Sequence, residues 1–233
     1  MKLSIIIPVY NERSTLEEII RRVRAVNLGQ LEREIVVVDD GSTDGTRDII
    51  QKISDIHYVF HEKNLGKGGA VKTGFRTVTG DIVIIQDADL EYNPNEIVDV
   101  IKPILDGRAL AANGVRIQPP RDIRRKKSYY WIMWAGGKLI TTTTNFLYWH
   151  NAQEYSGCYK AFSKKVVDAT LVETDDFDFE NELMCKLLRK KVPMVDVPIH
   201  YYPRSYGEGK KIRFRHGIKM LWAVIRWRFK RMA

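Results

Sequence analysis

The sequence predicts an α/β fold in which a mostly parallel central sheet is flanked by helices. Short apolar runs alternate with segments of helical spacing along the first half, and one run, 34–38, is rich in β-branched residues. Such a run is typical of a strand buried on both faces. Strands that alternate with helices of about 10–15 residues favour a doubly wound parallel sheet. With 44% hydrophobic and 29% charged residues, the composition is that of a globular protein.

The expected elements of the first half follow in a regular order. After a first strand at 3–9, the segment 11–26 has aliphatic residues at helical spacing. After the second strand, Ser42 or Thr43 offers an N-cap for a helix that runs to about residue 53. Pro94 suits the first position of a later helix, because its ring fixes a helical φ. The remaining expected elements are strands at 57–60, 81–86 and 109–113 and helices at 67–78 and 94–105.

The second half is less regular. A basic cluster at 121–127 is followed by an aromatic and Thr-rich stretch that ends at Trp149. Its rings are packing residues by default, although Trp and Tyr also favour a lipid interface. The later pattern predicts a helix at 178–189, a strand at 194–201 and a long helix at 212–231.

The net charge of +9 belongs to the end of the chain. Ten Lys and Arg residues and one Glu lie between Arg204 and Ala233, so the preceding 203 residues sum to zero. We therefore expect a main domain at 1–211 and a basic amphipathic helix at 212–233. Nucleic-acid binding is disfavoured, because no DNA or RNA motif accompanies the charge.

The expected C-terminal helix has two apolar strips. One strip is Ile218, Leu221, Trp222, Ile225 and Phe229, and the other is Met220, Val224 and Trp227. One strip can dock on the domain, while the other, flanked by cations, fits a membrane interface. The alternative is a packed terminal helix whose basic face is solvated.

Acidic residues follow three of the predicted strands, where ligands bind in open α/β sheets. They stand at Glu12, at Asp39-Asp40 and at Asp87-Ala88-Asp89, with Glu91 two residues further on. Carboxylates two residues apart on extended backbone point the same way, and such oxygen ligands suit Mg²⁺ or Mn²⁺. A solvated turn is the alternative for Asp87–Asp89 alone, but two such clusters together favour a site.

Other classes of protein are disfavoured. No Gly-x-Gly-x-x-Gly follows the first strand, and a P-loop at Gly66-Lys67 fails because His61 and Gly68 stand at required positions. Two cysteines exclude a disulfide scaffold. No apolar segment has the length of a transmembrane helix or a signal sequence, so we expect a cytoplasmic protein.

Four ordered motifs carry a resemblance to a known family. They are Ser4–Glu12 (SIIIPVYNE), Val36–Thr46 (VVVDDGSTDGT), Asn64–Gly68 (NLGKG) and Gln86–Asp89 (QDAD). Further matching segments lie at 113–116, 156–160, 177–183 and 202–211. From residue 4 to about 230, the chain resembles inverting family-2 glycosyltransferases of the GT-A fold. Within them it is most similar to dolichyl-phosphate mannose synthases and related polyprenyl-phosphate glycosyltransferases.

The resemblance implies a role for individual residues. The nucleotide-sugar would contact Pro8, Tyr10, Glu12, Asp39, Lys67, Asp87, Ala88, Arg204 and Lys210, with Asp39 on the base and Glu12 near the ribose. Mg²⁺ or Mn²⁺ would bind Asp87, Asp89 and Glu91, and the catalytic residues would be Asp89, Arg116 and Glu154. The chain departs from the family's usual Gln, Ser and Asp at Glu91, Val115 and Glu154.

The resemblance therefore predicts transfer of a hexose, of the mannose or glucose type, from a GDP- or UDP-sugar. The acceptor would be a polyprenyl phosphate at the cytosolic face of a membrane, reached through the C-terminal helix. Metal and basic side chains would stabilise the leaving diphosphate. One alternative is a soluble glycan or other hydroxyl acceptor, which needs a general base such as Glu154 or Asp178. Another is a non-catalytic module that binds sugar nucleotide or membrane.

Overall fold

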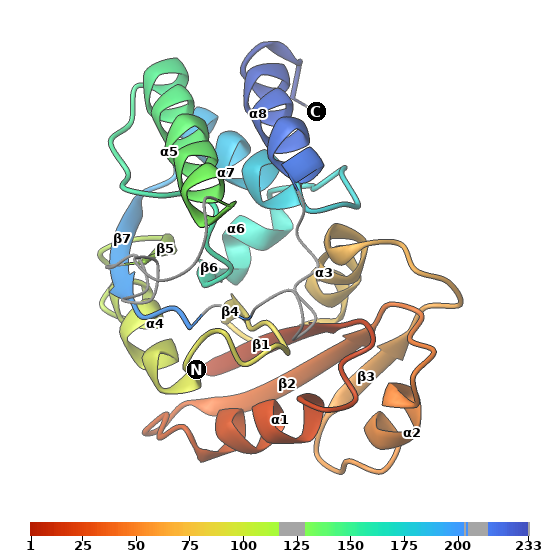
Figure 1. Cartoon of the computed structure of the whole chain (residues 1–233). Coiled ribbons are helices and arrows are strands. Elements are labelled where there is room, and N and C mark those ends of the chain that lie inside the picture. Colours follow the sequence, from red (N-terminus) through yellow and green to blue (C-terminus); the bar gives the residue numbers. More distant parts are fainter. Residues whose placement is uncertain (117–128, 203, 205–213, 233) are drawn as a thin grey trace.

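The apolar run at the N-terminus forms a central strand of a seven-stranded sheet (Figure 1). The computed structural model describes residues 1–116, 129–202, 204 and 214–232. The strands are β1 Lys2–Val9, β2 Glu32–Asp39, β3 His57–Phe60, β4 Ile82–Ile85, β5 Ala111–Arg116, β6 Lys160–Ser163 and β7 Met194–Ile199. They are ordered β3-β2-β1-β4-β6-β5-β7, and β6 alone among these is antiparallel to its neighbours. The predicted α/β class with a mostly parallel sheet is confirmed.

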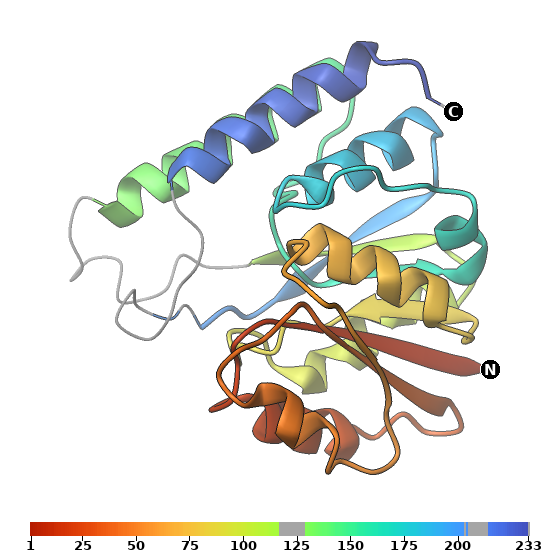
Figure 2. The same cartoon turned by 90° about the vertical axis from the view of Figure 1, so that its right-hand side faces the viewer.

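Helices cover both faces of the sheet, and two more helices form an outer layer. The helices are α1 Leu16–Ala25, α2 Thr46–Ile50, α3 Lys67–Thr77, α4 Ile97–Leu105, α5 Tyr129–Tyr148, α6 Lys164–Asp168, α7 Phe179–Arg189 and α8 Phe214–Phe229, with a 3₁₀ turn at Pro94–Glu96. Helices α1 and α4 lie on one face, and α3 and α7 lie on the other (Figure 2). Helices α5 and α8 run side by side on the outer side of α7.

The predicted start of the second helix differs from the structure. The helix expected from Ser42 or Thr43 begins at Thr46, after Gly45 in a left-handed conformation with φ 90°. The Ser42 hydroxyl instead accepts a hydrogen bond from the Asn11 N–H at 2.9 Å, so it joins the loops after β1 and β2.

The aromatic and Thr-rich stretch forms α5, which its composition did not predict. β-branched residues have low helix propensity, so the four consecutive threonines weaken the helical signal. Within the helix, the hydroxyls of Thr141 and Thr144 donate to the carbonyls of Gly137 and Ile140, at 2.9 and 2.8 Å. These bonds satisfy the hydroxyls inside the helix itself.

The C-terminal helix α8 docks through one of its two apolar strips. Met220, Val224 and Trp227 are buried against α5 and α7. The Tyr148 hydroxyl donates to the Val224 carbonyl at 2.9 Å, and Arg189 donates to the Trp227 carbonyl at 2.8 Å. The expected boundary at 211–212 lies outside the described residues, and the two-part division stays a prediction. No helix in the described ranges is long and apolar enough to span a membrane.

A buried carboxylate joins the strands at the end of the sheet opposite the acidic motifs. Glu34 on β2 accepts hydrogen bonds from the Ser4 hydroxyl and from the Thr79 N–H and hydroxyl, the last two at 2.9 and 2.6 Å. Burial alone would raise the pKa of Glu34, but these donors and Lys2 outweigh it and lower the pKa. Glu34 thereby ties β1 to β2 and to the turn before β4.

We predict that Glu34→Gln lowers the free energy of unfolding at pH 7 by about 1–3 kcal/mol, because an amide nitrogen would face a donor. Because the folded-state pKa is lowered, the wild-type contribution is present above the ordinary value of 4.5 and is lost as pH falls below it. Denaturant unfolding from pH 7 to pH 3 should therefore show the gap between variant and wild type closing. Glu32→Gln, at an exposed position of the same strand, is the control; an equal loss there would contradict the prediction.

Candidate active site

The loops after β1 and β2 meet at one edge of the sheet. Val9 pairs with Asp39 in the register of the two strands, so both strands end together. Asn11 adopts a left-handed conformation with φ 51°, and its side-chain oxygen accepts from the Thr43 N–H at 2.8 Å. This places the predicted nucleoside residues Pro8, Tyr10, Glu12 and Asp39 along one rim.

Asp39 is fully buried at this rim, and only one of its two carboxylate oxygens has hydrogen-bond partners among the described residues. Its Oδ2 accepts from Arg47 Nε at 2.6 Å and from the Ser42 N–H at 3.2 Å. Its Oδ1 has no hydrogen-bond partner among the described residues. A buried acceptor without a donor is costly, so this atom fits a ligand that brings an N–H or O–H group.

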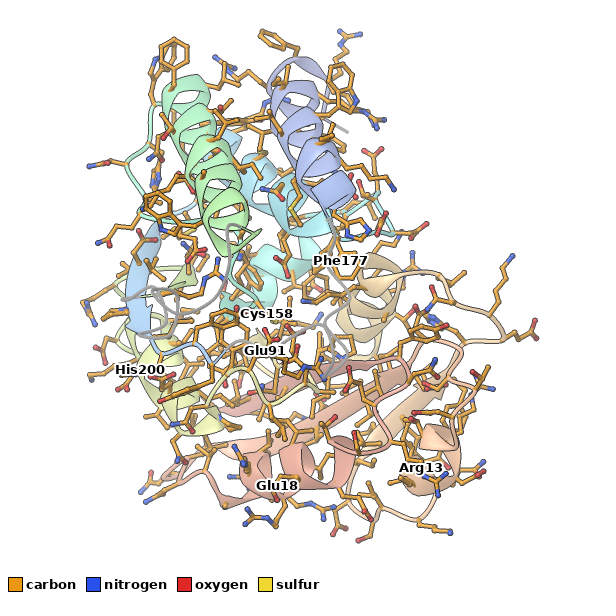
Figure 3. All side chains as sticks on the ribbon, in the orientation of Figure 1. Arg13, Glu18, Glu91, Cys158, Phe177 and His200 are labelled. Carbon is orange, nitrogen blue, oxygen red and sulfur yellow. The ribbon has the colours of Figure 1, made fainter. Side chains whose placement is uncertain are left out.

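The acidic residues after β1 and β4 converge on Arg204. Its guanidinium contacts Glu12 through two nitrogens, at 3.2 and 3.3 Å, and Asp89 Oδ2 at 3.3 Å. Arg204 also lies 3.7 Å from Glu91, and its backbone N–H donates to the same carboxylate at 2.9 Å. Glu91 lies in the loop after β4, and in the view of Figure 3 it stands between the strands β1 and β2 and the helices α5 and α8. The structure therefore brings the predicted residues Glu12, Asp89, Glu91 and Arg204 together.

This cluster holds more negative than positive charge. Burial, followed by the charges of Asp87 and Glu91, raises the pKa of Asp89 to about 7, against the opposing effect of Arg204. The site is therefore one in which a further cation would be stabilised.

Asp87 is held by Lys67, as predicted for neighbours in one site. Lys67 Nζ lies 2.9 Å from Asp87 and 3.0 Å from Glu180 on α7. Burial opposes the charge on Lys67, but these carboxylates outweigh it and raise its pKa. Glu180 was missed from the sequence as a site residue. Glu180 lies in the 177–183 segment that matches the family, but nothing in that segment indicates a contact with Lys67.

The glycines around Lys67 serve packing. Gly66 has φ 95°, and a Cβ there would lie 2.5 Å from the Asp175 carbonyl oxygen. The Gly69 N–H donates to that same carbonyl at 3.0 Å. The loop at 64–69 is therefore pressed against the segment that precedes α7, which fixes the start of α3 and with it Lys67.

Arg116 and Glu154 form an ion pair at the end of β5. Arg116 Nε donates to Glu154 at 2.9 Å, and Nη2 contacts the second carboxylate oxygen. The guanidinium also lies over the Tyr201 ring, 4.7 Å from its centre, and the Tyr201 hydroxyl donates to Glu91. Tyr201, which the sequence did not single out, connects this pair to the acidic cluster. Asp178, the other candidate base, has one buried oxygen without a partner among the described residues, and burial raises its pKa.

Among the described residues, no group of three or more His, Cys, Asp or Glu is placed to hold a metal, and the predicted set Asp87, Asp89 and Glu91 stays a prediction. Glu91 accepts hydrogen bonds from the Tyr201 hydroxyl and from the Arg204 backbone N–H. Asp87 and Asp89 remain as two candidate ligands with excess negative charge, which suits Mg²⁺ or Mn²⁺ when phosphates supply other ligands. The predicted nucleotide-sugar residue Lys210 lies outside the described residues.

Solved structures share this fold. Glucosyl-3-phosphoglycerate synthase from Mycobacterium tuberculosis, in complex with Mn²⁺, uridine diphosphate and phosphoglyceric acid, matches at a TM-score of 0.71 and 20% identity. The match covers 97% of this chain and 76% of that one. A second complex of the same enzyme, with phosphoglyceric acid, matches at a TM-score of 0.72 and 18% identity, over 97% and 79% of the two chains.

The family is given by the sequence itself. The model of "Glycosyl transferase family 2" matches residues 4–171, which include most of β1, the Asp39 rim and the Asp87–Asp89 motif. With a sheet of this topology and acidic residues gathered at the ends of β1, β2 and β4, the chain belongs to glycosyl transferase family 2.

Proposed function

We propose that the protein is a metal-dependent inverting glycosyltransferase that moves a hexose from a GDP- or UDP-sugar to a polyprenyl phosphate at a membrane surface. The observation that carries the choice of acceptor is an exposed aromatic and basic surface on α5 and α8, described below. Both helices begin on the side of the molecule at which β1, β2 and β4 end (Figure 2). A lipid-linked acceptor that runs along α5 and α8, from the exposed rings near their C-terminal ends, would therefore reach the active site at the starts of the two helices.

The donor side rests on the rim described above. The unpartnered Asp39 Oδ1 would accept a hydrogen bond from the nucleobase, and Glu12 would lie near the ribose. Lys67 and Arg204 would neutralise the diphosphate, as charge-assisted donors do. Asp87 and Asp89 would hold Mg²⁺ or Mn²⁺, which when bound supplies Lewis-acid stabilisation of the leaving group. The complexes of the M. tuberculosis synthase contain Mn²⁺ and uridine diphosphate on a similar fold.

The acceptor side rests on the Arg116–Glu154 pair. A phosphate oxygen is already anionic near pH 7, so its attack needs positioning by a guanidinium and no general base. Glu154 is engaged by Arg116 and is not poised to take a proton from a hydroxyl. The second candidate is a hydroxyl acceptor, favoured by the raised pKa of Asp178, because a carboxylate with a raised pKa is a better base.

The α5–α8 surface consists of the exposed side chains Leu139 and Phe146 on α5, Trp149 directly after α5, and Ile218, Trp222 and Phe229 on α8. Trp149 is 85% exposed, and Phe146 and Phe229 are each 76% exposed. Arg228 lies over the Trp149 ring at 5.6 Å, so the ends of the two helices adjoin. Exposed Lys138, Lys219 and Arg226 flank the aromatic residues. Exposed rings flanked by cations are the composition of an interfacial surface on anionic lipid.

We predict that Asp89→Asn abolishes hexose transfer, because the amide removes a charge that holds the metal and diphosphate. In thermal-shift titrations, GDP- or UDP-sugar with Mn²⁺ should raise the melting temperature of the wild type, since a ligand of the native state stabilises it. The variant should lose most of that rise while keeping its ligand-free melting temperature within a few degrees. Undiminished turnover would refute the metal role of Asp89. Asp99→Asn, an exposed change on α4, is the control.

A second prediction concerns stereochemistry. Attack of the acceptor from the face opposite the diphosphate inverts the anomeric centre, so an α-linked donor should give a β-linked product. The anomeric coupling constant in NMR of the purified product measures this, and a retained configuration would rule out the proposed single displacement.

The membrane surface is tested with Trp222→Ser/Phe229→Ser in the full chain. Truncation of 212–233 is a poorer test, because it would uncover the buried face of α5 and α7. Burial of a large apolar side chain contributes about 1.5–3 kcal/mol, so the double variant should bind phosphatidylcholine–phosphatidylserine vesicles at least about tenfold more weakly. Co-sedimentation measures the bound fraction.

The matched control is Tyr58→Ser, an exposed ring on β3 at the far side of the sheet from α8 (Figure 1). It should leave vesicle binding unchanged. If the wild type ignores vesicles, or if transfer to a short water-soluble hydroxyl acceptor exceeds transfer to a polyprenyl phosphate, the second candidate function replaces the first.

A further inference from the structure

Arg204 occupies a position in which it competes with a metal ion for the same carboxylate. Its guanidinium contacts Asp89 Oδ2 at 3.3 Å, while the other oxygen, Oδ1, accepts from the Glu91 N–H at 3.1 Å. Both oxygens of the Asp89 carboxylate, to which the proposed function assigns the metal, therefore have partners within the protein itself. A divalent cation that binds Oδ2 would stand next to a guanidinium of like charge.

Arg204 is held there by charge from two other elements. Glu12, after β1, contacts two guanidinium nitrogens, and Glu91 lies against the third at 3.7 Å. The side chains of Glu12 and Glu91 are each 8% exposed and that of Arg204 is 18% exposed, so water screens these contacts little. Three carboxylates around one guanidinium form a site that favours a cation, whichever cation occupies it.

We infer that Arg204 is a built-in counter-ion, which Mg²⁺ or Mn²⁺ displaces from Asp89 when the donor binds. The inference rests on the proposed function, because it takes Asp89 as a metal ligand. Displacement removes the Asp89 carboxylate from Arg204, and the diphosphate that binds with the metal would supply negative charge to Arg204 in its place. Metal alone therefore binds weakly, and metal and nucleoside diphosphate strengthen each other's binding.

The test measures binding of Mn²⁺ without nucleotide, by titration calorimetry and by electron paramagnetic resonance of free Mn²⁺. Arg204→Gln should bind Mn²⁺ about tenfold more tightly than the wild type or better, because the competing charge is gone. Addition of GDP or UDP should tighten Mn²⁺ binding strongly in the wild type and much less in the variant, since the two effects are linked. Mn²⁺ affinity that is unchanged or weaker in Arg204→Gln overturns the inference.

Two variants distinguish the effect of the Arg204–Asp89 contact on Mn²⁺ affinity from the effect of any lost positive charge. Arg47→Gln removes a positive charge at the same rim, where Arg47 forms an ion pair with Asp39, whereas Asp89 is paired with Arg204. The Mn²⁺ affinity of this variant should change less than twofold. Arg204→Lys keeps the charge and loses the planar fork, so its affinity should lie between those of wild type and Arg204→Gln. Equal gains in Arg47→Gln and Arg204→Gln would contradict displacement, because any lost positive charge would then suffice.

Asp89→Asn distinguishes failure of the inference from failure of the proposed function. If Asp89→Asn abolishes Mn²⁺ binding while Arg204→Gln leaves it unchanged, the metal site stands and the exchange is wrong. If Asp89→Asn binds Mn²⁺ like the wild type, the proposed metal site itself is wrong. Thermal unfolding of each variant, followed by circular dichroism, ensures that folded protein is compared.

Discussion

The constraint on which the site depends is the burial of carboxylates at one edge of the sheet. Parallel strands that end together bring Glu12, Asp39, Asp87 and Asp89 to one place, where unpaired negative charge is costly. These carboxylates are accordingly paired with basic side chains that come from different parts of the fold. Arg47 of α2 contacts Asp39, Lys67 of α3 contacts Asp87, and Arg204 contacts Glu12 and Asp89.

One of those cations, Lys67, is positioned by the segment that precedes α7. Glu182, fully buried on α7, accepts from the N–H groups of Glu173 and Thr174 at 2.7 and 2.8 Å. The glycines around Lys67 pack against this segment. Asp176 of the same segment also forms an ion pair with Lys219 of α8 at 2.6 Å. One short segment therefore contacts the loop that carries a proposed donor-binding lysine and also the helix that carries the proposed membrane surface.

The sequence predicted what depends on local pattern. β-branched runs predicted the parallel strands, and carboxylates placed directly after strands predicted the residues of the rim. It missed contacts between distant segments, such as Lys67 with Glu180 and Arg116 with Tyr201, because nothing local in either partner indicates the other. It also missed α5, whose threonines satisfy their hydroxyls within the helix. For α8, the sequence predicted two apolar strips without deciding which of them docks, and packing on α5 and α7 buries the strip that contains Trp227.

The acceptor that we propose rests on a combination of these features. A small hydroxyl acceptor would need a base near the reacting carbon, and it would give α5 and α8 no reason to expose large rings beside cations. The proposed polyprenyl phosphate would account for both, because its phosphate suits Arg116 and its chain suits an apolar surface. It would also give a role to the pairing of Arg116 with Glu154 and to its stacking on Tyr201, because a guanidinium held by a carboxylate and a ring is already oriented for an incoming phosphate.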